Sequence, residues 1–241
     1  MKGFTAIFLI LCTLALSACG FTGFTFVTGS GNVGSESREV SNFDAVTLEG
    51  SGDLIVTQGN QESLKIEAEE NLIPYIRTEV RGHTLHIFID HTNSLSIDAN
   101  RPMRYYVSMK DVTGLTLSGS GTITSDNINT KNLDINLSGS GDVEIDKLKA
   151  DSLTIDLSGS GKCVLNGEVA SQNMNISGSG KCDASELKGK DVDIDISGSG
   201  KAMVAATNTL NVTITGSGDI TYSGNPKISQ TITGSGKLVA K

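Results

Sequence analysis

Three histidines are the side chains of this sequence best suited to holding a metal ion or activating a nucleophile. His83, His86 and His91 lie in one short segment, and imidazole is a common zinc ligand. In a strand, however, His83 and His86 point to opposite faces, and no acidic residue stands beside them at a recognised ligand spacing. The chain also lacks a Gly-x-Ser-x-Gly elbow for a nucleophilic serine. We expect no catalytic residue, no metal site and no cofactor.

Two cysteines occupy equivalent positions in consecutive repeats of the sequence. Cys163 and Cys182 each stand four residues after the first glycine of a Gly-Ser-Gly tripeptide. If the repeats stack in register, the two Cα atoms lie ~5 Å apart, a separation that a disulfide permits. An oxidising compartment would allow that bond, but stacked parallel neighbours are poorly oriented for it, and buried thiols also serve as small apolar fillers. We favour a buried thiol pair and keep the disulfide as the alternative.

Lysine follows four of the Gly-Ser-Gly tripeptides, at Lys162, Lys181, Lys201 and Lys237. A Walker phosphate loop needs a further glycine five residues earlier and Ser or Thr after the lysine, and these sites have neither. Lys162, Lys181 and Lys201 would instead form a basic stripe along stacked repeats, which could touch an acidic glycan. Solvated lysines that keep a β surface from aggregating are the alternative, and we favour it.

The N-terminus has the features of an export signal. A charged start and a short apolar run lead into Leu16-Ser17-Ala18-Cys19, which resembles the bacterial lipobox. We expect a lipoprotein signal peptide over residues 1–18, lipidation at Cys19, and a flexible Gly/Ser/Thr-rich tether over residues 19–37. Gly20 follows the cysteine where inner-membrane retention would favour Asp. The sequence therefore predicts an exported protein, lipid-anchored in the cell envelope at the bacterial outer membrane.

The element that must position all these residues is a repeat. From Gly50 onward Gly-Ser-Gly occurs eight times, and its last seven copies are 20, 20, 19, 20, 18 and 18 residues apart. A fixed period near this length is typical of solenoids, in which each unit buries its apolar face against its neighbours. The copies begin at Gly50, Gly119, Gly139, Gly159, Gly178, Gly198, Gly216 and Gly234.

Apolar and polar residues alternate on both sides of each tripeptide, which is typical of strands. Leu137, Leu157 and Ile176, for example, each stand two residues before the first glycine. We predict two short strands per repeat, hinged at Gly-Ser-Gly, with both glycines facing inward. Crossovers between parallel strands are nearly always right-handed. The fold class is therefore all-β: a single-stranded right-handed parallel β-helix, or solenoid, with rungs of about 20 residues.

The first part of the domain is less regular. Gly119 stands 69 positions after Gly50, a distance long enough for about three more turns of an atypical, capping end. The segment from Asn71 to Arg77 contains Pro74, so we expect a short helix or a loop there and no central strand.

The charge pattern limits the partners of the protein. A formal net charge of −8 and a pI near 4.9 disfavour nucleic-acid binding. Outward positions of successive repeats carry Asp alternating with Asn and Thr, which keeps like charges from stacking. Nothing in the sequence groups these carboxylates into a catalytic site. One such column is Asn136, Asp156, Asn175, Asp195, Thr213 and Thr231.

Taken together, the lipobox, the stretch from Ser37 to Leu54, the stretch from Leu115 to Gly121 and the later rungs resemble the head GIN domain family of autotransporter-type adhesins. The resemblance covers residues 38–241. It implies an exported, often lipid-anchored bacterial β-helix, and it brings no established catalytic residues.

We therefore expect a non-enzymatic lipoprotein, an adhesin-like surface or periplasmic scaffold, that is held to a membrane by its lipid and binds a glycan or a cell-surface protein. Two alternatives stay open. One is a polysaccharide-active lyase or hydrolase, and the other is a self-associating structural protein of the envelope, which would be a homo-oligomer.

Overall fold

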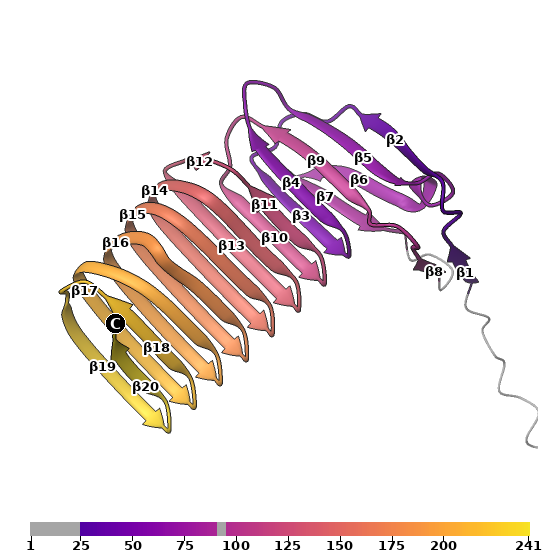
Figure 1. The fold of residues 1–241 in the computed structure, drawn as a ribbon. Coiled ribbons are helices and arrows are strands. Elements are labelled where there is room, and N and C mark those ends of the chain that lie inside the picture. The colour runs from indigo at the N-terminus through magenta and orange to yellow at the C-terminus, as the bar shows by residue number, and fades with distance from the viewer. Residues whose placement is uncertain (1–24, 91–94) are drawn as a thin grey trace, which may run out of the picture.

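The computed structural model describes residues 25–90 and 95–241 (Figure 1). The predicted signal peptide, Cys19 and His91 lie outside the described residues. Stacked parallel strands form a solenoid that ends in the C-terminal strands, and an irregular group of strands caps its other end (Figure 1). No helix in the described part of the chain is long and apolar enough to span a bilayer.

The solenoid begins with β3 and β4 and resumes at β10. Its strands are β3 (Ala45–Gly50), β4 (Asp53–Gln58), β10 (Gly114–Gly119), β11 (Thr122–Ser125), β12 (Ile128–Asn129), β13 (Asn132–Gly139), β14 (Asp142–Gly159), β15 (Lys162–Gly178), β16 (Lys181–Gly198), β17 (Lys201–Gly216), β18 (Asp219–Ser223), β19 (Lys227–Gly234) and β20 (Lys237–Ala240).

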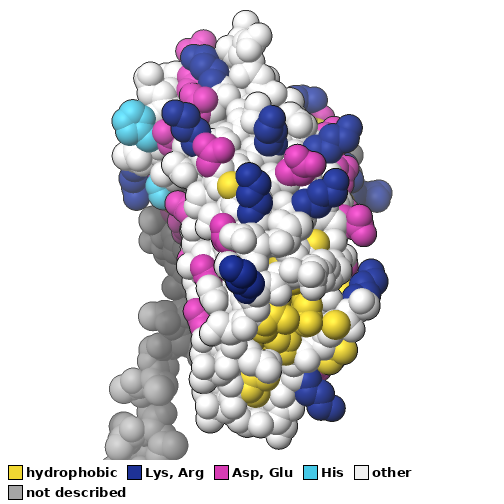
Figure 2. All heavy atoms as spheres, turned by 90° about the vertical axis from the view of Figure 1, so that its left-hand side faces the viewer, with side chains coloured by type: hydrophobic (Ala, Val, Ile, Leu, Met, Phe, Trp, Pro, Cys, Tyr) yellow, Lys and Arg dark blue, Asp and Glu magenta, His cyan; other side chains and the backbone are white. Residues whose placement is uncertain are grey.

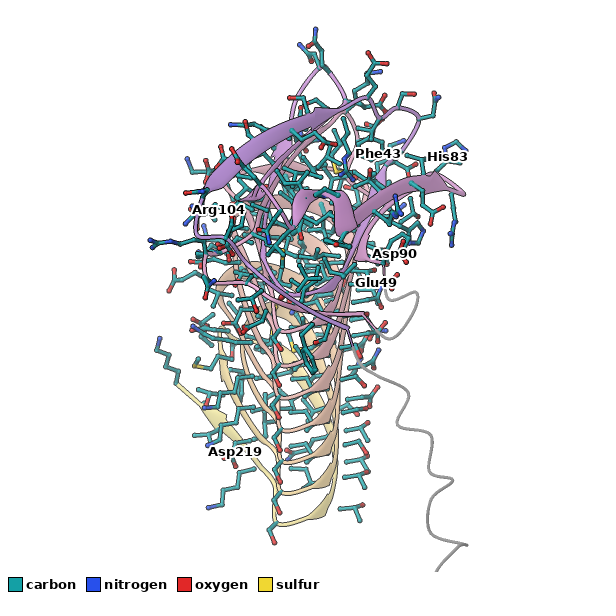
Figure 3. All side chains as sticks on the ribbon, turned by 90° about the vertical axis from the view of Figure 1, so that its right-hand side faces the viewer. Phe43, Glu49, His83, Asp90, Arg104 and Asp219 are labelled. Carbon is teal, nitrogen blue, oxygen red and sulfur yellow. The ribbon has the colours of Figure 1, made fainter. Side chains whose placement is uncertain are left out.

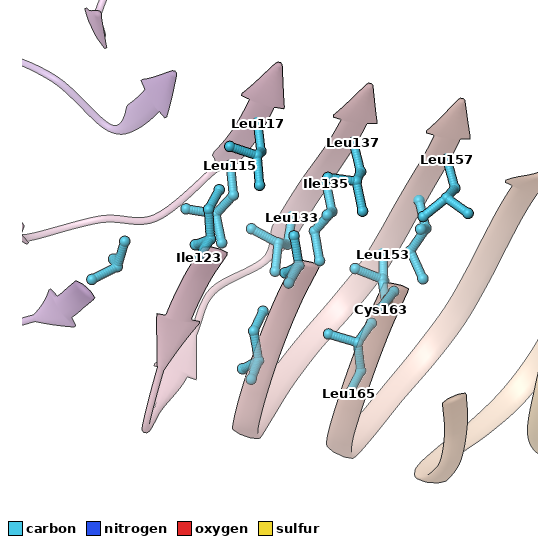
Figure 4. Close-up of a cluster of buried hydrophobic side chains, with 14 of the residues drawn as sticks. Leu115, Leu117, Ile123, Leu133, Ile135, Leu137, Leu153, Leu157, Cys163 and Leu165 are labelled. Carbon is cyan, nitrogen blue, oxygen red and sulfur yellow. The ribbon is translucent and has the colours of Figure 1, made fainter. Parts of the chain in front are cut away.

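Aliphatic side chains of successive rungs stack inside the solenoid (Figure 4). Leu117, Leu137 and Leu157 lie opposite one another in β10, β13 and β14, and the same column continues through Ile176, Ile196 and Ile214. All six side chains are buried. Burying one such side chain fully contributes ~1.5–3 kcal/mol. The predicted β-solenoid with aliphatic columns in register is confirmed.

In the tripeptides from Gly119 to Gly218 the two glycines have different roles, so the prediction that both face inward is wrong for the first. Gly159, a first glycine, has φ of +121°, which glycine adopts far more readily than other residues, and it is half-exposed. Gly161, the second, is buried, and a Cβ there would lie 2.8 Å from Leu137 Cδ2. The first glycine therefore turns the chain, and the second leaves room for the core.

The rungs are also more continuous than two strands with a hinge. From β14 to β17 one strand runs from each Gly-Ser-Gly corner to the next. The remaining bend is absorbed by register shifts, such as the one between Ile145 and Leu148, because a bulge bends a strand without ending it. At the glycine corner the ladder persists too, since the N–H of Ser160 donates to the carbonyl of Gly139 at 2.9 Å.

The segment between Gly50 and Gly119 adds no turn between these two corners, whereas we predicted about three more turns. Gly50 lies directly opposite Gly119, so β3 and β10 belong to adjacent rungs. The intervening residues form the predicted atypical cap, in which β7 pairs parallel to β3 and β9 parallel to β4. An antiparallel pair of β5 with β9 and an antiparallel hairpin of β6 with β7 complete it. Apolar alternation alone does not distinguish these pairings from further rungs.

Cap strands also include part of the expected tether. Residues 25–28 form β1 and pair with β8, and residues 33–38 form β2 and pair with β5, so ordered structure begins before residue 38. The cap elements are β1 (Thr25–Thr28), β2 (Val33–Arg38), β5 (Ser63–Glu69), η1 (Ile73–Tyr75), β6 (Ile76–Arg81), β7 (Thr84–Ile89), β8 (Leu95–Asp98) and β9 (Arg104–Met109). The short 3-10 helix η1 contains Pro74 and confirms the expectation for that segment.

A buried carboxylate ties the cap together. Glu69 is fully buried and accepts backbone N–H groups from Gly31 at 2.5 Å, Asn100 at 2.8 Å and Arg101 at 3.2 Å. Burial by itself raises the pKa of Glu69, but the hydrogen bonds from Gly31 and Asn100 outweigh it, and the pKa lies below the ordinary value. The ionised side chain therefore joins β5 to the loop before β2 and to the turn after β8.

Candidate functional site

A groove crosses the side of the solenoid just after the Gly-Ser-Gly corners, over β15 to β20. It has a volume of about 500 Å³. Four lysines and two aspartates contribute to its lining, together with apolar side chains that include Met203 and Val239. In the view of the C-terminal end, hydrophobic side chains gather with Lys and Arg around them (Figure 2). The groove therefore combines an apolar surface with positive charge.

Its positive side is a column of lysines from three successive rungs, which we call the lysine column. Lys162 lies opposite Lys181, and Lys181 lies opposite Lys201, so the predicted stripe is present. An aspartate stands at each end of this column. Asp142 accepts the backbone N–H of Lys162 at 3.1 Å, and Asp219 Oδ2 lies 3.3 Å from Lys201 Nζ. Asp219 is on the side of the last rungs, well away from the cap (Figure 3).

The apolar side of the groove comes from the outward position two residues further along each strand. Met203 is 41% exposed and Val239 is 50% exposed, and Thr221 lies between them in the ladder. Asp183 occupies the same column one rung earlier, where its carboxylate accepts hydrogen bonds from the N–H and hydroxyl of Ser185 at 3.1 and 2.7 Å. Asp183 is thereby engaged within its own strand, while Met203 and Val239 face solvent.

The two cysteines lie beneath this surface. Cys163 and Cys182 are directly opposite in β15 and β16, and both are buried free thiols. Burial raises the pKa of the Cys182 thiol well above its ordinary value, and the contact with Cys163 adds to this effect. Because the thiolate is the nucleophile and the metal ligand, a protonated buried thiol serves neither role. The pair fills the interior of two rungs.

The described histidines do not converge. His83 is exposed in the turn between β6 and β7 with φ of +66°, so our assumption that it lies in a strand is wrong. His86 lies in β7 with Nδ1 3.9 Å from Glu49 Oε1. Figure 3 places His83 at the outer edge of the cap. Within residues 25–90 and 95–241, no three His, Cys, Asp or Glu side chains are grouped closely enough to hold a metal ion.

Carboxylates of the other solenoid face are held in polar ladders. Asn175 Nδ2 donates to Asp156 at 2.8 Å, and Asn211 Nδ2 donates to Asp193 at 2.6 Å. Hydrogen bonds from Thr209, and next from Asn208, lower the pKa of Asp191. These contacts hold the acids apart in hydrogen-bonded ladders, which is the arrangement expected of a stable sheet surface.

Three features of the structure were not predicted from the sequence: the apolar half of the groove, the role of Glu69, and the buried Gln172. The first has a signal in the repeat, because Met203 and Val239 are apolar at a position where alternation predicts an outward side chain. For Glu69 the repeat offers no signal, because its partners Gly31 and Asn100 are distant in the sequence.

Several solved structures are similar to this chain in fold. A putative adhesin from Bacteroides fragilis has a TM-score of 0.84 at 24% identity, covering 89% of this chain and 100% of its own. A putative lipid binding protein from Parabacteroides distasonis has a TM-score of 0.76 at 28% identity, covering 90% and 100%. A putative adhesin from Parabacteroides merdae has a TM-score of 0.69 at 21% identity, covering 90% and 99%.

No curated protein matches the chain in sequence. The family model described as "Putative auto-transporter adhesin, head GIN domain" matches residues 42–226. That span begins just before β3 and includes most of the cap and the solenoid as far as the loop after β18. The family that the sequence motifs resemble is therefore confirmed, and the chain belongs to the head GIN domain family.

Proposed function

We propose that this protein is a non-enzymatic, adhesin-like lipoprotein that uses the side of its solenoid to bind another surface. The observation that carries this proposal is the groove, in which an ordered column of lysines borders exposed apolar side chains. Stacked rungs fix these side chains at regular spacing on a rigid support, which suits recognition of an extended partner. Membership of the head GIN domain family supports an adhesin-like role.

The binding role can be tested on cells. We expect bacteria that display the full-length chain to adhere to host epithelial cells, mucin or other bacteria more than the same strain without it. Soluble chain added in excess should compete for the same sites. Equal adhesion of the two strains to every one of these surfaces would contradict the proposal.

Export and lipidation are a separate part of the proposal. Lipid chains on Cys19 would hold the protein at the membrane through burial of their CH₂ groups, each worth ~0.8 kcal/mol. A Cys19→Ala variant should therefore leave the membrane fraction, and the wild-type N-terminal peptide should carry the mass of attached acyl chains. An unmodified Cys19 in protein recovered from membranes would exclude this anchor.

A second candidate role is self-association through the last rung. The inner-column residues Ile228 and Ile232 are 42% and 36% exposed, and among the described strands β19 pairs only with β17. An edge of this kind can pair with a second copy of the chain. Light scattering would then show a mass that grows with concentration, and Ile232→Lys would abolish that growth. A constant monomer mass would dismiss this role.

A further inference from the structure

Acidic columns of the solenoid keep like charges apart. Asp156 lies opposite Asn136 in one rung and Asn175 in the next. Asp193 is separated from other acids in the same way by Asn173 and Asn211. Because like charges directly opposite each other destabilise a sheet, this alternation is what stability alone would select.

The lysine column departs from that rule. Lys162, Lys181 and Lys201 follow one another without a neutral spacer. Among all paired positions of the described strands, these are the only like-charged residues directly opposite each other. In the described structure, no carboxylate lies within ion-pair distance of the side-chain ammonium group of Lys162 or Lys181. A departure from the rule that like charges are kept apart is expected where residues have been selected for function.

We propose that the lysine column binds a linear acidic glycan that lies along the solenoid axis. This inference rests on the proposed binding role and gives it a ligand class. Each rung would present one ammonium group to the carboxylate or sulfate groups of the glycan, and each ion pair would relieve the repulsion between stacked lysines. Counterion release would make the association weaken as salt is added.

The spacing of the column favours a glycan over an acidic peptide. Neighbouring lysines are separated by the strand spacing of ~4.8 Å, whereas side chains on one face of an extended peptide recur every ~6.7 Å. An acidic peptide therefore falls out of register within a few rungs. Successive monosaccharides of an extended glycan advance by about one strand spacing, so a glycan whose linkages turn its acidic groups to one side can follow the column.

The apolar side of the groove supports the same ligand. Met203 and Val239 line the groove beside the charged column and are exposed. The C–H faces of sugar rings can pack on such side chains, so one ligand would use both sides of the groove. A chain of inorganic phosphates would use only the lysines. The contribution of Met203 therefore distinguishes a glycan from other linear polyanions.

The experiment measures binding of the full-length chain to polygalacturonate by calorimetry at low salt. Lys181→Gln should weaken binding about twofold to fivefold, the range that an exposed charge pair supports. The triple change of Lys162, Lys181 and Lys201 to Gln should weaken it about tenfold to a hundredfold if the three contacts add. Met203→Ser should also reduce the affinity. The control is Lys147→Gln, an exposed lysine outside the groove, which should bind as wild type does.

Thermal unfolding separates a binding role from a structural one. Removing the central charge should leave the Tm of Lys181→Gln unchanged or higher, because stacked like charges no longer repel. Weaker binding together with a retained Tm supports the proposal. A lower Tm with wild-type affinity would make the column structural and overturn it.

Other probes test the ligand class. Fully methyl-esterified polygalacturonate has the same sugar backbone without the charge and should not bind. Polyphosphate that binds as tightly as polygalacturonate, with no effect of Met203→Ser, would overturn the glycan assignment. Binding only to phosphatidylglycerol vesicles would overturn it too. If displayed protein mediates adhesion but polygalacturonate does not bind, the glycan inference fails and the adhesin-like role stands. If the displayed protein mediates no adhesion and polygalacturonate does not bind, both the adhesin-like role and the glycan inference are refuted.

Discussion

Glu69 is the only fully buried carboxylate among the described residues, and its ionised form is the one that the cap requires. Its partners are backbone N–H donors from Gly31, Asn100 and Arg101. A glutamine there would turn its own NH₂ group toward some of these donors. The sequence places Glu69 at the end of a strand, but only the fold brings the donors to it.

We expect this carboxylate to make stability depend on pH on the acid side. The pKa in the folded protein is below the ordinary value of 4.5, so the unfolded chain binds a proton first as the pH falls. The stabilisation is present above about pH 4.5 and is lost as the pH falls from there through the lower folded pKa. Urea unfolding across this range should show a shallower loss in Glu69→Gln than in wild type, and a lower stability at neutral pH. Exposed Glu186 is the control position, and Glu186→Gln should keep the wild-type slope.

Gln172 is a second buried polar residue, and it has no apparent partner. Its amide nitrogen and oxygen make no hydrogen bond in the structure, and it lies between Leu153 and Val192 in an otherwise aliphatic column. We expect Gln172→Met, which has a similar shape, to raise the free energy of unfolding by about 1–3 kcal/mol, the cost of an unpaired buried polar group. Urea denaturation measures this. A decrease would show that Gln172 has a partner in solution, and the exposed neighbour Asn173→Ala should change stability little.

The residue scale also shows a limit of sequence reasoning. Repeat alignment places Cys163 and Cys182 in one column, and the structure agrees. That alignment cannot give the direction of a side chain in a turn, which is why His83 was placed in a strand. The positive φ of His83 belongs to the two-residue turn of the hairpin that joins β6 to β7, and period-two alternation alone does not reveal this turn.

At the scale of the strand, the second glycine of each corner is a packing requirement. An alanine at Gly161 would put its Cβ 2.8 Å from Leu137 Cδ2 and closer still to the carbonyl oxygen of Gly141. We expect Gly161→Ala to lower the free energy of unfolding by about 1–3 kcal/mol or more, as overpacking does. Ser160→Ala changes an exposed side chain in the same tripeptide and should have almost no effect. Thermal unfolding of the two variants compares them, and equal stability would contradict the packing account.

Element boundaries were predictable at the Gly-Ser-Gly corners of the regular rungs and not in the cap. From β13 to β17, period-two alternation and the tripeptide together set both the strands and their register. Between Gln58 and Gly114 the same alternation occurs in strands with antiparallel partners. A half-buried strand shows the same period-two pattern whether its partner is parallel or antiparallel. Counting residues therefore suggested extra rungs where the chain forms a cap.

For the whole molecule, stability should vary along the solenoid axis. Each rung contacts only its neighbours, so a terminal rung opens more easily than a central one. The last rung, β19 and β20, has exposed or half-exposed side chains throughout, whereas inner positions of β14 to β16 are buried. We expect hydrogen exchange to be fastest in β19 and β20 and slowest in β14 to β16. Uniform protection across all rungs would imply a partner on the last rung.

The overall architecture and the family could be predicted from the sequence, but only the lysine side of the groove could. A fixed period with inward aliphatic residues defines a solenoid physically, because stacking is the only way each rung buries its apolar face. The lysines of the groove were visible as a stripe. Their meaning depends on the contrast with the acidic columns and on Met203 and Val239, which becomes apparent only when the exact register is known.

The direct pairing of Gly50 with Gly119 has a consequence for how such molecules can change in size. In the sequence, most of the cap is inserted between two windings that are adjacent in space. The number of windings that follow the cap therefore does not depend on it. Removing residues 140–159 would join equivalent points of two neighbouring windings and shorten the rod by ~4.8 Å. The reach of the protein can thus be altered in whole steps while its cap stays the same.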